Sequence, residues 1–388
     1  MEENVHKIRQ YLREHRPEME AFLRALAAIE TPSHAPAAQE PLFDILAAKF
    51  RPLGYHIIRV PGRKTGGFLI ARPTRRERCC PIQLLIGHCD TVWEKGTLQS
   101  MPVEQAGGQL KGPGIFDMKA GITQMVFALQ AIHDIGLKME ATPVCLINSD
   151  EEIGSRESTP AIRRLARIAG RAFVLEPPLG PEGKLKTTRK GLGRFTLTVK
   201  GKAAHAGLDP GKGASAILEL SHQIQHLFNL NEPEKGITVN VGMIEGGISP
   251  NVIAPVSKAI IDVRVPTHKD AARLSEAILS LQPATPGASL EIEGGFGRPP
   301  MEPTPRNRRL WQQARKAGVQ MGLELQETSA GGGSDGNTAS LYTATLDGLG
   351  TTGDGAHAAH EFIFLDKLEE RALLLTLLLL LPSGRKKD

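Results

Sequence analysis

Two adjacent glutamates, Glu151 and Glu152, stand close behind an apolar run that covers residues 142–147. Neighbouring carboxylates repel each other, so a site that holds both needs positive charge nearby or keeps one of them protonated. A metal ion supplies that charge and separates their roles, because one can ligate the ion while the other transfers a proton. By itself such an acidic segment is more typical of a solvated loop. The metal interpretation therefore depends on the rest of the chain.

Two other apolar runs also lead into residues that can ligate metals. Residues 82–86 run directly into Gly87-His88-Cys89-Asp90, and residues 172–175 run into Glu176. Short, almost wholly apolar runs are typical of strands that are buried on both faces of a sheet. In an open parallel α/β sheet, the site lies beyond the carboxyl ends of the strands. We therefore expect these side chains to share one site with the two glutamates.

Two glycine-rich segments extend this prediction. Residues 111–117 precede a stretch with helical spacing, which places Asp117 near a helix N-terminus. An aspartate there is usually only a cap, but beside three such strand ends it is a candidate for the same site. The second segment, residues 328–337, contains Gly332 and Gly333. Such a loop exposes backbone N–H groups that suit a carboxylate or phosphate, although a flexible turn would have the same composition.

The order of the expected elements predicts two domains, one inserted into the other. Residues 4–30 fit an amphipathic helix, and strands and helices alternate after it. From Arg194 the pattern changes to β-α-β-β-α-β, the order of a ferredoxin-like unit. We expect an α/β catalytic domain of residues 1–192 and 304–388 and an inserted α+β domain of residues 193–303.

Composition and charge exclude several classes of protein. The chain has 388 residues, of which 40% are hydrophobic and 23% charged, which is typical of a folded globular protein of two domains. The net charge of +5 is modest, only 4% of residues are aromatic, and the basic residues are scattered. These features argue against nucleic acid as a partner.

The sequence also indicates a cytoplasmic location. The N-terminus has no apolar signal-peptide core, and the leucine-rich run of residues 372–381 is too short to cross a bilayer. We expect that run to be a buried last helix and expect no membrane partner. The cysteines show no CxxC pairing and are interpreted as reduced thiols. They are Cys79, Cys80, Cys89 and Cys145.

Six motifs occur in a fixed order along nearly the whole chain: GHCDTVW, GPGIFDMKAG, SDEEIGS, LEP, GKAAHAG and GAHAAHEF. In these motifs the chain resembles the M20 family of di-zinc peptidases and aminoacylases, and within it the glutamate carboxypeptidases of the carboxypeptidase G2 type. The resemblance implies a zinc-peptidase-like catalytic domain with a mixed central sheet. It also implies that the inserted ferredoxin-like domain serves dimerisation and acts as a lid.

The resemblance implies two zinc ions in each subunit. One would be held by His88 and Glu176, and Asp117 would bridge both ions; the family usually has a cis peptide bond just after this residue. Glu152 and a C-terminal histidine would hold the second ion. The family pattern selects His357 for that position, and His360 is the alternative. Ligand type does not separate zinc cleanly from cobalt or manganese, so Co²⁺ and Mn²⁺ stay open.

The resemblance also implies the catalytic roles. Glu151 would take a proton from the attacking water and return it to the leaving amine. Asp90 would orient and polarise His88 without binding metal. His205, in the inserted domain, would reach the active site of the partner subunit and stabilise the oxyanion, which implies a homodimer.

Substrate recognition is implied at four further positions. Arg264 and Asn251 match family positions that help to bind the terminal carboxylate of the substrate, and arginine suits this task because it can bind both oxygens. An arginine on a strand can instead form a surface ion pair. Gly332 and Gly333 would offer backbone donors to the same carboxylate.

The main functional hypothesis is a zinc-dependent carboxypeptidase that releases a C-terminal, glutamate-like acidic amino acid from a peptidyl or acyl amide. The alternative is an N-acyl amino acid amidohydrolase or a dipeptidase with the same chemistry. A third hypothesis is a metal-free binding or scaffold relative. The sequence of such a relative would lack one of the metal-ligand residues. Every ligand position is filled.

Overall fold

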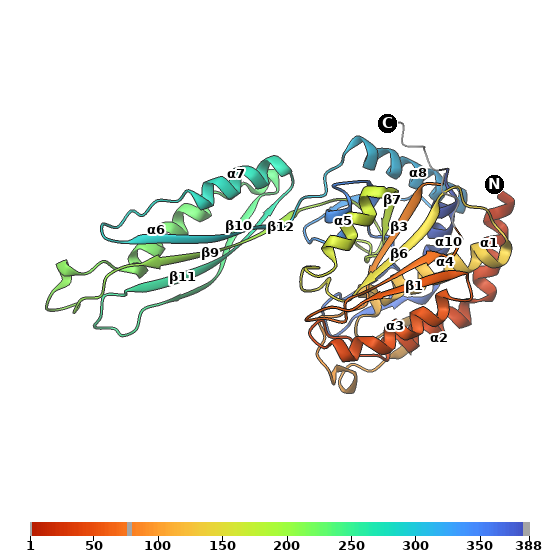
Figure 1. Cartoon of the computed structure of the whole chain (residues 1–388), viewed down its shortest axis with the longest axis horizontal. Helices are drawn as coiled ribbons and strands as arrows, with labels where there is room; N and C mark the ends of the chain where they lie inside the picture. The colour runs from red at the N-terminus through yellow and green to blue at the C-terminus, as the bar shows by residue number, and fades with distance from the viewer. Residues whose placement is uncertain (1, 76–79, 383–388) are drawn as a thin grey trace. The chain divides into compact units, whose positions relative to one another are not determined.

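The computed structural model describes residues 2–75 and 80–382 (Figure 1). They divide into two compact units, of which the first holds residues 2–187, 303–329 and 334–382. The second unit holds residues 188–302 together with Ala330–Gly333. It therefore begins before residue 193, where the strand pattern changes, and it includes part of the second glycine-rich segment. Cys79 lies outside the described residues.

A six-stranded mixed sheet forms the centre of the first unit. In order across the sheet, its strands are β1 (Tyr55–Val60), β2 (Phe68–Pro73), β6 (Thr142–Asn148), β3 (Ile82–His88), β7 (Ala169–Val174) and β14 (Ala344–Leu346). The neighbours from β6 to β14 pair in parallel, whereas the β1–β2 and β2–β6 pairs are antiparallel. The predicted α/β class with a mixed central sheet is confirmed.

The register of this sheet brings three strand ends to one edge. His88, the last residue of β3, pairs with Asn148, the last residue of β6. On the other side of β3, Ile86 pairs with Val174, the last residue of β7. Every residue of β3 is buried, so a slip of one residue would move apolar side chains off both packed faces. The chain therefore leaves three neighbouring strands at one edge.

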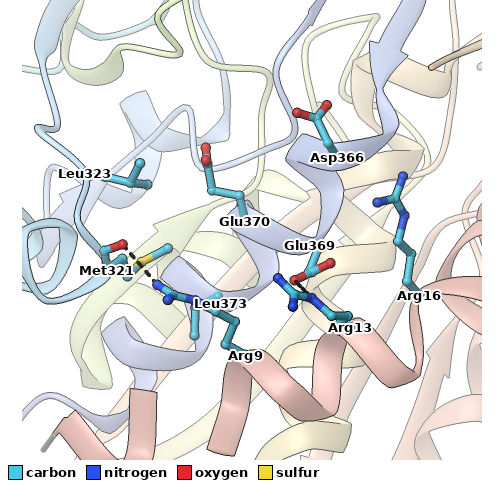
Figure 2. A pocket seen from close by; sticks show the side chains of 9 residues that line it. All are labelled: Arg9, Arg13, Arg16, Met321, Leu323, Asp366, Glu369, Glu370 and Leu373. Carbon is cyan, nitrogen blue, oxygen red and sulfur yellow. Dashed lines mark hydrogen bonds and ion pairs between the residues drawn. The ribbon is translucent and has the colours of Figure 1, made fainter. Parts of the chain in front are cut away.

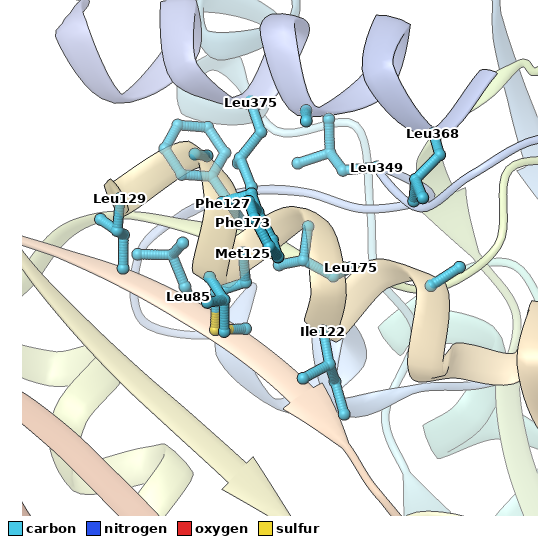
Figure 3. Packing of buried hydrophobic residues seen from close by; sticks show 14 of the residues in the cluster. Leu85, Ile122, Met125, Phe127, Leu129, Phe173, Leu175, Leu349, Leu368 and Leu375 are labelled. Carbon is cyan, nitrogen blue, oxygen red and sulfur yellow. The ribbon is translucent and has the colours of Figure 1, made fainter. Parts of the chain in front are cut away.

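Two layers of helices cover the two faces of the sheet, because successive side chains of a strand point to opposite sides. Leu85 packs in one cluster with α4 and α10, whereas Leu84 and Ile86 pack in the other with α5 and α9. Figure 3 shows Leu85 and Phe173 among the side chains of α4. Each such buried side chain contributes about 1.5–3 kcal/mol. The helices of the first cluster are α1 (Glu2–Glu14), α2 (Arg16–Ala27), α3 (Pro36–Phe50), α4 (Ala120–Ile135), α8 (Pro305–Met321) and α10 (Leu365–Leu380), and those of the second are α5 (Thr159–Ile168) and α9 (Asp335–Ala339).

The N-terminal helix predicted over residues 4–30 is two helices, α1 and α2, which meet at His15. Pro17 lies in the first turn of α2. Proline has no N–H group and its ring clashes with the carbonyl four residues earlier, so it is tolerated at a helix start and not in a helix interior. The prediction of one helix was therefore wrong at this point.

A small second sheet brings two distant segments of the first unit together. Its strands, in order, are β15 (Gly353–Asp354), β16 (Phe362–Phe364), β5 (Gln109–Lys111) and β4 (Glu104–Ala106). Phe362 pairs with Lys111, so the segment that precedes β16 lies beside the segment that follows β5. The latter continues into a short helical turn, η2 (Ile115–Lys119). A further strand pair consists of β8 (Leu185–Arg189) and β13 (Glu327–Ala330).

The second unit has four antiparallel strands and two helices. In chain order its elements are β9 (Gly191–Lys200), α6 (Ala216–Phe228), β10 (Thr238–Gly246), β11 (Val256–Val265), α7 (His268–Leu279) and β12 (Ser289–Arg298). The spatial order β10-β11-β9-β12 is that of a ferredoxin-like sheet. Alternate residues of β9, such as Phe195 and Leu197, are buried beneath the helices.

Short 3₁₀ turns complete the description: η1 (Thr97–Gln99), η3 (Pro210–Lys212) and η4 (Pro233–Lys235). Within residues 2–75 and 80–382, no helix is both long and apolar enough to cross a bilayer. The leucine-rich helix α10 packs instead in the core of the first unit.

Gly121 offers a test of how closely α4 packs at the edge of the sheet. A Cβ atom at this position would lie 2.1 Å from the carbonyl oxygen of Leu175, the residue before Glu176. Alanine normally stabilises a helix by about 1 kcal/mol relative to glycine. We nevertheless expect Gly121→Ala to lower the free energy of unfolding by about 1–3 kcal/mol, because backbone must move to admit the methyl group. Urea denaturation measures this change.

Gly170→Ala is the matched control, because a Cβ atom there meets its nearest neighbours at an ordinary 3.7 Å. This substitution should change the free energy of unfolding by less than about 0.5 kcal/mol. Equal effects of the two substitutions would contradict the close approach of α4 to Leu175.

Candidate metal centre

The carboxyl edge of the central sheet gathers histidine and carboxylate side chains. His88 ends β3, Glu151 and Glu152 lie in the turn after β6, and Glu176 lies two residues beyond β7. Ligand atoms of His88, Glu151 and Glu176 lie within 4.8 Å of one another. The same holds for His88, Asp117 and Glu152. The structure thus brings together side chains from four separate segments of the sequence.

Asp117 lies between two histidines. Its Oδ1 atom is 3.1 Å from Nε2 of His88, and its Oδ2 atom is 3.6 Å from Nε2 of His357. Each histidine faces a further carboxylate: Glu176 Oε1 is 3.6 Å from His88 Nε2, and Glu152 Oε2 is 3.1 Å from His357 Nε2. The cluster therefore has two halves joined by one carboxylate. The peptide bond after Asp117 is cis, as the resemblance implied.

His357 has a backbone conformation that is rare for residues other than glycine. Its φ angle is +62°, in the left-handed region, where a side chain costs about 1–2 kcal/mol. Such strain often occurs at functional sites. His360, the alternative ligand, is exposed in the same turn. The structure places the ring of His357, with its measured distances to Asp117 and Glu152, in the cluster.

One buried oxygen atom provides a test of whether a cation fits. Within the described chain, Oε1 of Glu152 is buried and has no hydrogen-bond partner. Burial raises the pKa of Glu152 to about 7, because a carboxylate loses solvation there. A bound cation would satisfy that oxygen and stabilise the ionised form. Histidine nitrogens and carboxylate oxygens are the ligands of catalytic zinc sites, so the residues present fit a divalent ion.

The same carboxylates raise the pKa values of the two histidines. Burial works to lower the pKa of His88, but hydrogen bonds to Asp117, Asp90 and Glu176 outweigh it and hold that pKa well above the usual value. Hydrogen bonds to Asp117 and Glu152 raise the pKa of His357 to about 10. In return, the two histidines hold the pKa of Asp117 well below its usual value against the effect of burial. Metal binding needs a nitrogen lone pair on the imidazole, so each protonated histidine must lose a proton to solvent when a cation binds.

Asp90 links His88 to the glutamate turn. Nδ1 of His88 lies 3.0 Å from the backbone oxygen of Asp90 and 3.4 Å from its Oδ1 atom. The Asp90 carboxylate accepts hydrogen bonds from the backbone N–H groups of Glu151 and Glu152, at 3.2 and 3.1 Å. It also accepts one from Ser33. This arrangement assigns the Nδ1 proton of His88 to the Asp90 side and directs Nε2 toward Asp117.

Glu361 is a residue of this centre that the sequence did not single out. It is buried, and its carboxylate accepts hydrogen bonds from the backbone of residues 114–117 and from the indole of Trp93. In the sequence it is the glutamate of the motif GAHAAHEF. No local pattern signals its role, which depends on the pairing of β16 with β5, the strand before the Asp117 turn.

The second unit carries the other predicted site residues, at two ends of its sheet. Near one end, the backbone N–H of Ala206 donates to the carbonyl of Asn251, so His205 and Asn251 lie on neighbouring loops. Near the other end, Arg264 pairs with Asp262 and donates to the carbonyl of Gly331 at 3.0 Å. Between Val256 and Arg264, β11 spans about 27 Å. His205 and Arg264 of one chain are therefore far apart.

The glycine-rich loop is held by two arginines through its carbonyl oxygens. Arg189 donates to Gly332 at 3.1 Å, as Arg264 does to Gly331. A Cβ atom on Gly333 would lie 2.8 Å from the side chain of Leu192, whereas Gly331 and Gly332 face open space. Gly333 is therefore a packing requirement, and the two preceding glycines are free to approach a ligand.

A cavity of about 580 Å³ lies elsewhere in the first unit (Figure 2). Arginines from α1 and the start of α2 line one side, and acidic residues of α10 line the other. Arg9 donates to the backbone oxygen of Met321, and Arg13 lies 3.9 Å from Glu369. Its lining includes none of the predicted site residues.

Comparison with known proteins indicates a metallopeptidase. The family model "Peptidase dimerisation domain" matches residues 187–282. The chain is 27% identical to carboxypeptidase G2 of Pseudomonas sp. strain RS-16, over 88% of this chain and 84% of that protein. It is 24% identical to succinyl-diaminopimelate desuccinylase of Dechloromonas aromatica, over 84% and 89% of the two chains.

The fold agrees with these relatives. An M20 family metallo-carboxypeptidase of Sulfolobus solfataricus superposes with a TM-score of 0.71 at 16% identity, covering 94% of this chain and 99% of the other. In sequence and in fold the chain is thus similar to peptidases of the M20 family.

The two C-terminal histidines can be separated by metal stoichiometry. His357→Ala removes the ring that faces Asp117 and Glu152, so we expect metal content to fall from two ions per chain to about one. His360→Ala, three residues later in the same exposed turn, should retain two. Elemental analysis of dialysed, zinc-loaded protein measures both. Loss of an ion from the His360 variant alone would reverse the assignment.

Proposed function

We propose that the protein is a metal-dependent amide hydrolase that releases a C-terminal amino acid, preferentially an acidic, glutamate-like one, from a small peptidyl or acyl substrate. The observation that carries this proposal is the position of Asp117, with one carboxylate oxygen toward His88 and the other toward His357. A further glutamate, Glu151, lies in the same cluster with His88 and Glu176. Similarity to carboxypeptidase G2 favours this substrate class.

In this proposal two zinc ions occupy the cluster, with Co²⁺ or Mn²⁺ as possible substitutes. His88 and Glu176 would hold one ion, Glu152 and His357 would hold the other, and Asp117 would contribute to both. When bound, such a pair of ions polarises the scissile carbonyl and lowers the pKa of water toward neutrality. The chain supplies five ligands and no thiolate, which matches catalytic zinc rather than structural zinc.

Glu151 is the proposed proton carrier. It takes a proton from the attacking water and returns it to the nitrogen of the leaving amine, so that the amide C–N bond breaks with a neutral leaving group. Asp90 positions this residue, because its carboxylate holds the backbone N–H groups of Glu151 and Glu152. The same carboxylate group lies against His88, so one residue aligns the base and a ligand together.

His205 has a ring suited to stabilise an oxyanion. Its Nδ1 atom accepts hydrogen bonds from the backbone N–H groups of Gly207 and Leu208, both at 3.1 Å. A neutral ring that accepts at Nδ1 carries its proton on Nε2, which then faces outward as a donor. We propose that this donor acts on the oxyanion in the centre of a partner subunit.

We propose that the terminal carboxylate of the substrate binds near Arg264 and the glycine loop. Arg264 uses Nε and one terminal nitrogen for Asp262 and Gly331. The amides of Gly332 and Gly333 would supply backbone donors, and Asn251 would come from the partner with His205. Because Arg264 already forms an ion pair with Asp262, a substrate carboxylate must share the Arg264 guanidinium with Asp262 or displace Asp262 from it.

A second candidate function uses the same centre on N-acyl amino acids or dipeptides. The similarity to succinyl-diaminopimelate desuccinylase favours the amidohydrolase form of this alternative. The two functions differ in what flanks the scissile amide. A panel of acyl-glutamates, simple N-acyl amino acids, and α- and β-linked dipeptides distinguishes them.

Glu151→Ala tests the proposed chemistry on this panel. We expect zinc-loaded wild-type protein to cleave substrates with C-terminal glutamate or aspartate. The variant should keep two ions but lose about 10²- to 10⁴-fold in kcat, because general acid–base catalysis contributes that much. Mass spectrometry of the products and elemental analysis provide the two readouts.

Three outcomes would change the proposal. Retained turnover in the Glu151 variant would remove Glu151 from the mechanism. Cleavage confined to acetyl or fatty-acyl amino acids would favour the amidohydrolase. Wild-type protein that takes up no zinc, cobalt or manganese would contradict the metal centre itself.

We further propose a homodimer formed through the second unit. β10 is an edge strand of the sheet, and its residues Met243 and Ile244 are 58% and 63% exposed. Phe228 and Ile217 of the neighbouring helix α6 are each 48% exposed. An unpaired strand edge beside exposed apolar side chains is typical of an interface. A second copy would pair with this edge and cover these side chains, in keeping with the matched dimerisation domain.

Ile244→Lys should weaken this dimer, because it places a charge on the strand edge. We expect light scattering to show half the wild-type mass at micromolar concentration, with kcat reduced in parallel if His205 acts across the interface. Leu279→Lys changes a similarly exposed apolar residue on α7 and should leave the mass unchanged. A dimeric Ile244 variant would exclude this edge as the interface.

A further inference from the structure

Glu361 makes an unusually complete set of hydrogen bonds beside the metal centre. Its Oε2 atom accepts from the backbone N–H of Gly114 and from Nε1 of Trp93, both at 2.9 Å. Its Oε1 atom accepts from the backbone N–H groups of Phe116 and Asp117, at 2.9 and 3.1 Å. The side chain is buried, so these donors take the place of water.

The pattern of donors matches an ionised carboxylate. A carboxylate is an acceptor only, with two lone-pair positions on each oxygen, and four N–H groups fill them here. Hydrogen bonds to a charged acceptor are about twice as strong as neutral ones. An amide in the same place would direct an NH₂ group at two of the donors. The negative charge of Glu361 and the acceptor positions of its two oxygens therefore both match the four donors.

The contacts of Glu361 end on the residue that joins the two halves of the cluster. Asp117 faces His88 through one oxygen and His357 through the other. The N–H of Asp117 is held by Glu361, four residues after His357 in the chain. One short segment therefore carries both a candidate ligand and the group that fixes the bridging residue.

We propose that Glu361 is a positioning residue for the metal pair, which holds the backbone of the Asp117 turn so that both Asp117 oxygens face their histidines. This inference rests on the proposed two-ion centre. Glu361 does not touch substrate or metal in this role. It acts through Asp117.

The role is separable from holding the fold together. The strands on either side of this contact are already paired, Phe362 with Lys111 and Ile363 with Leu110. The backbone of Glu361 is also anchored independently, because its carbonyl accepts from Gly112 and its N–H donates to Ala358. Loss of the side-chain charge should therefore loosen the turn at Asp117 and leave the small sheet in place.

Glu361→Gln tests the proposal through metal affinity, which needs no substrate. Loss of an outer partner of a ligand typically weakens metal binding 10- to 100-fold, and we expect a loss in this range for at least one of the two zinc ions. Competition with a chromophoric chelator measures it. The thermal midpoint of the metal-free protein reports any purely structural effect.

Trp93 provides a second readout, because its indole donates to the same carboxylate. In a Trp311→Phe background it is the sole tryptophan of the chain. Zinc should shift its emission in protein with Glu361 and should shift it less in the Glu361→Gln form. Equal zinc-induced shifts in the two forms would count against the coupling.

Glu30→Gln is the matched control. Glu30 also holds a loop through two backbone N–H groups, those of Gly96 and Leu98 at 2.8 Å, but not the Asp117 turn. It should leave both zinc affinities within about twofold of wild type. Wild-type affinity in Glu361→Gln, or an equal loss in the two variants, would overturn the proposal.

Two further outcomes are informative. If Glu361→Gln does not fold, Trp93→Phe removes one of the four donors without a change of charge; weaker zinc binding then supports the proposal and unchanged binding contradicts it. If wild-type protein itself binds no pair of ions, the proposed function fails, and this result is distinct from a failure of Glu361 alone.

Discussion

Electrostatic repulsion among buried carboxylates is the constraint on which this structure depends. Asp90, Asp117, Glu151, Glu152 and Glu176 meet at one edge of a sheet whose strands are apolar on both faces. Each acidic group is stabilised differently: Asp90 by backbone N–H groups, Asp117 by two histidines, and Glu152 incompletely. The incomplete case is the most informative one, since a cation is the simplest group that would satisfy it.

The central sheet determines which side chains meet at this edge. Parallel strands that end at one edge deliver His88, the glutamate turn and Glu176 to the same place, although they are far apart in sequence. The small sheet brings His357 and Asp117 together, because it lays the segment that carries His357 beside the Asp117 turn. Substituting core residues under either sheet would therefore disturb several ligands at once.

Much of this was accessible from the sequence. Apolar runs that end in His88 and Glu176 predicted strands and a shared edge, and the change to alternating residues such as Phe195 and Leu197 predicted a second kind of sheet. Local pattern could not reveal contacts that depend on tertiary pairing. Three of the four donors around Glu361 come from a turn some 245 residues away, and the fourth is Trp93. Arg264 meets Gly331 because residues 330–333 of the glycine-rich segment belong to the second unit. Pro17 marked a helix break that periodicity had concealed.

The separation of His205 and Arg264 along one sheet has a genetic consequence. If both serve a single centre, each centre draws on two copies of the chain, and a damaged copy impairs its partner as well as itself. An inactive allele altered at His205 would then be partly dominant over the wild type. Two alleles that are inactive alone, one altered at His205 and the other at a metal ligand such as Glu176, would restore activity when expressed together. Selection acts on such a protein as a pair of chains.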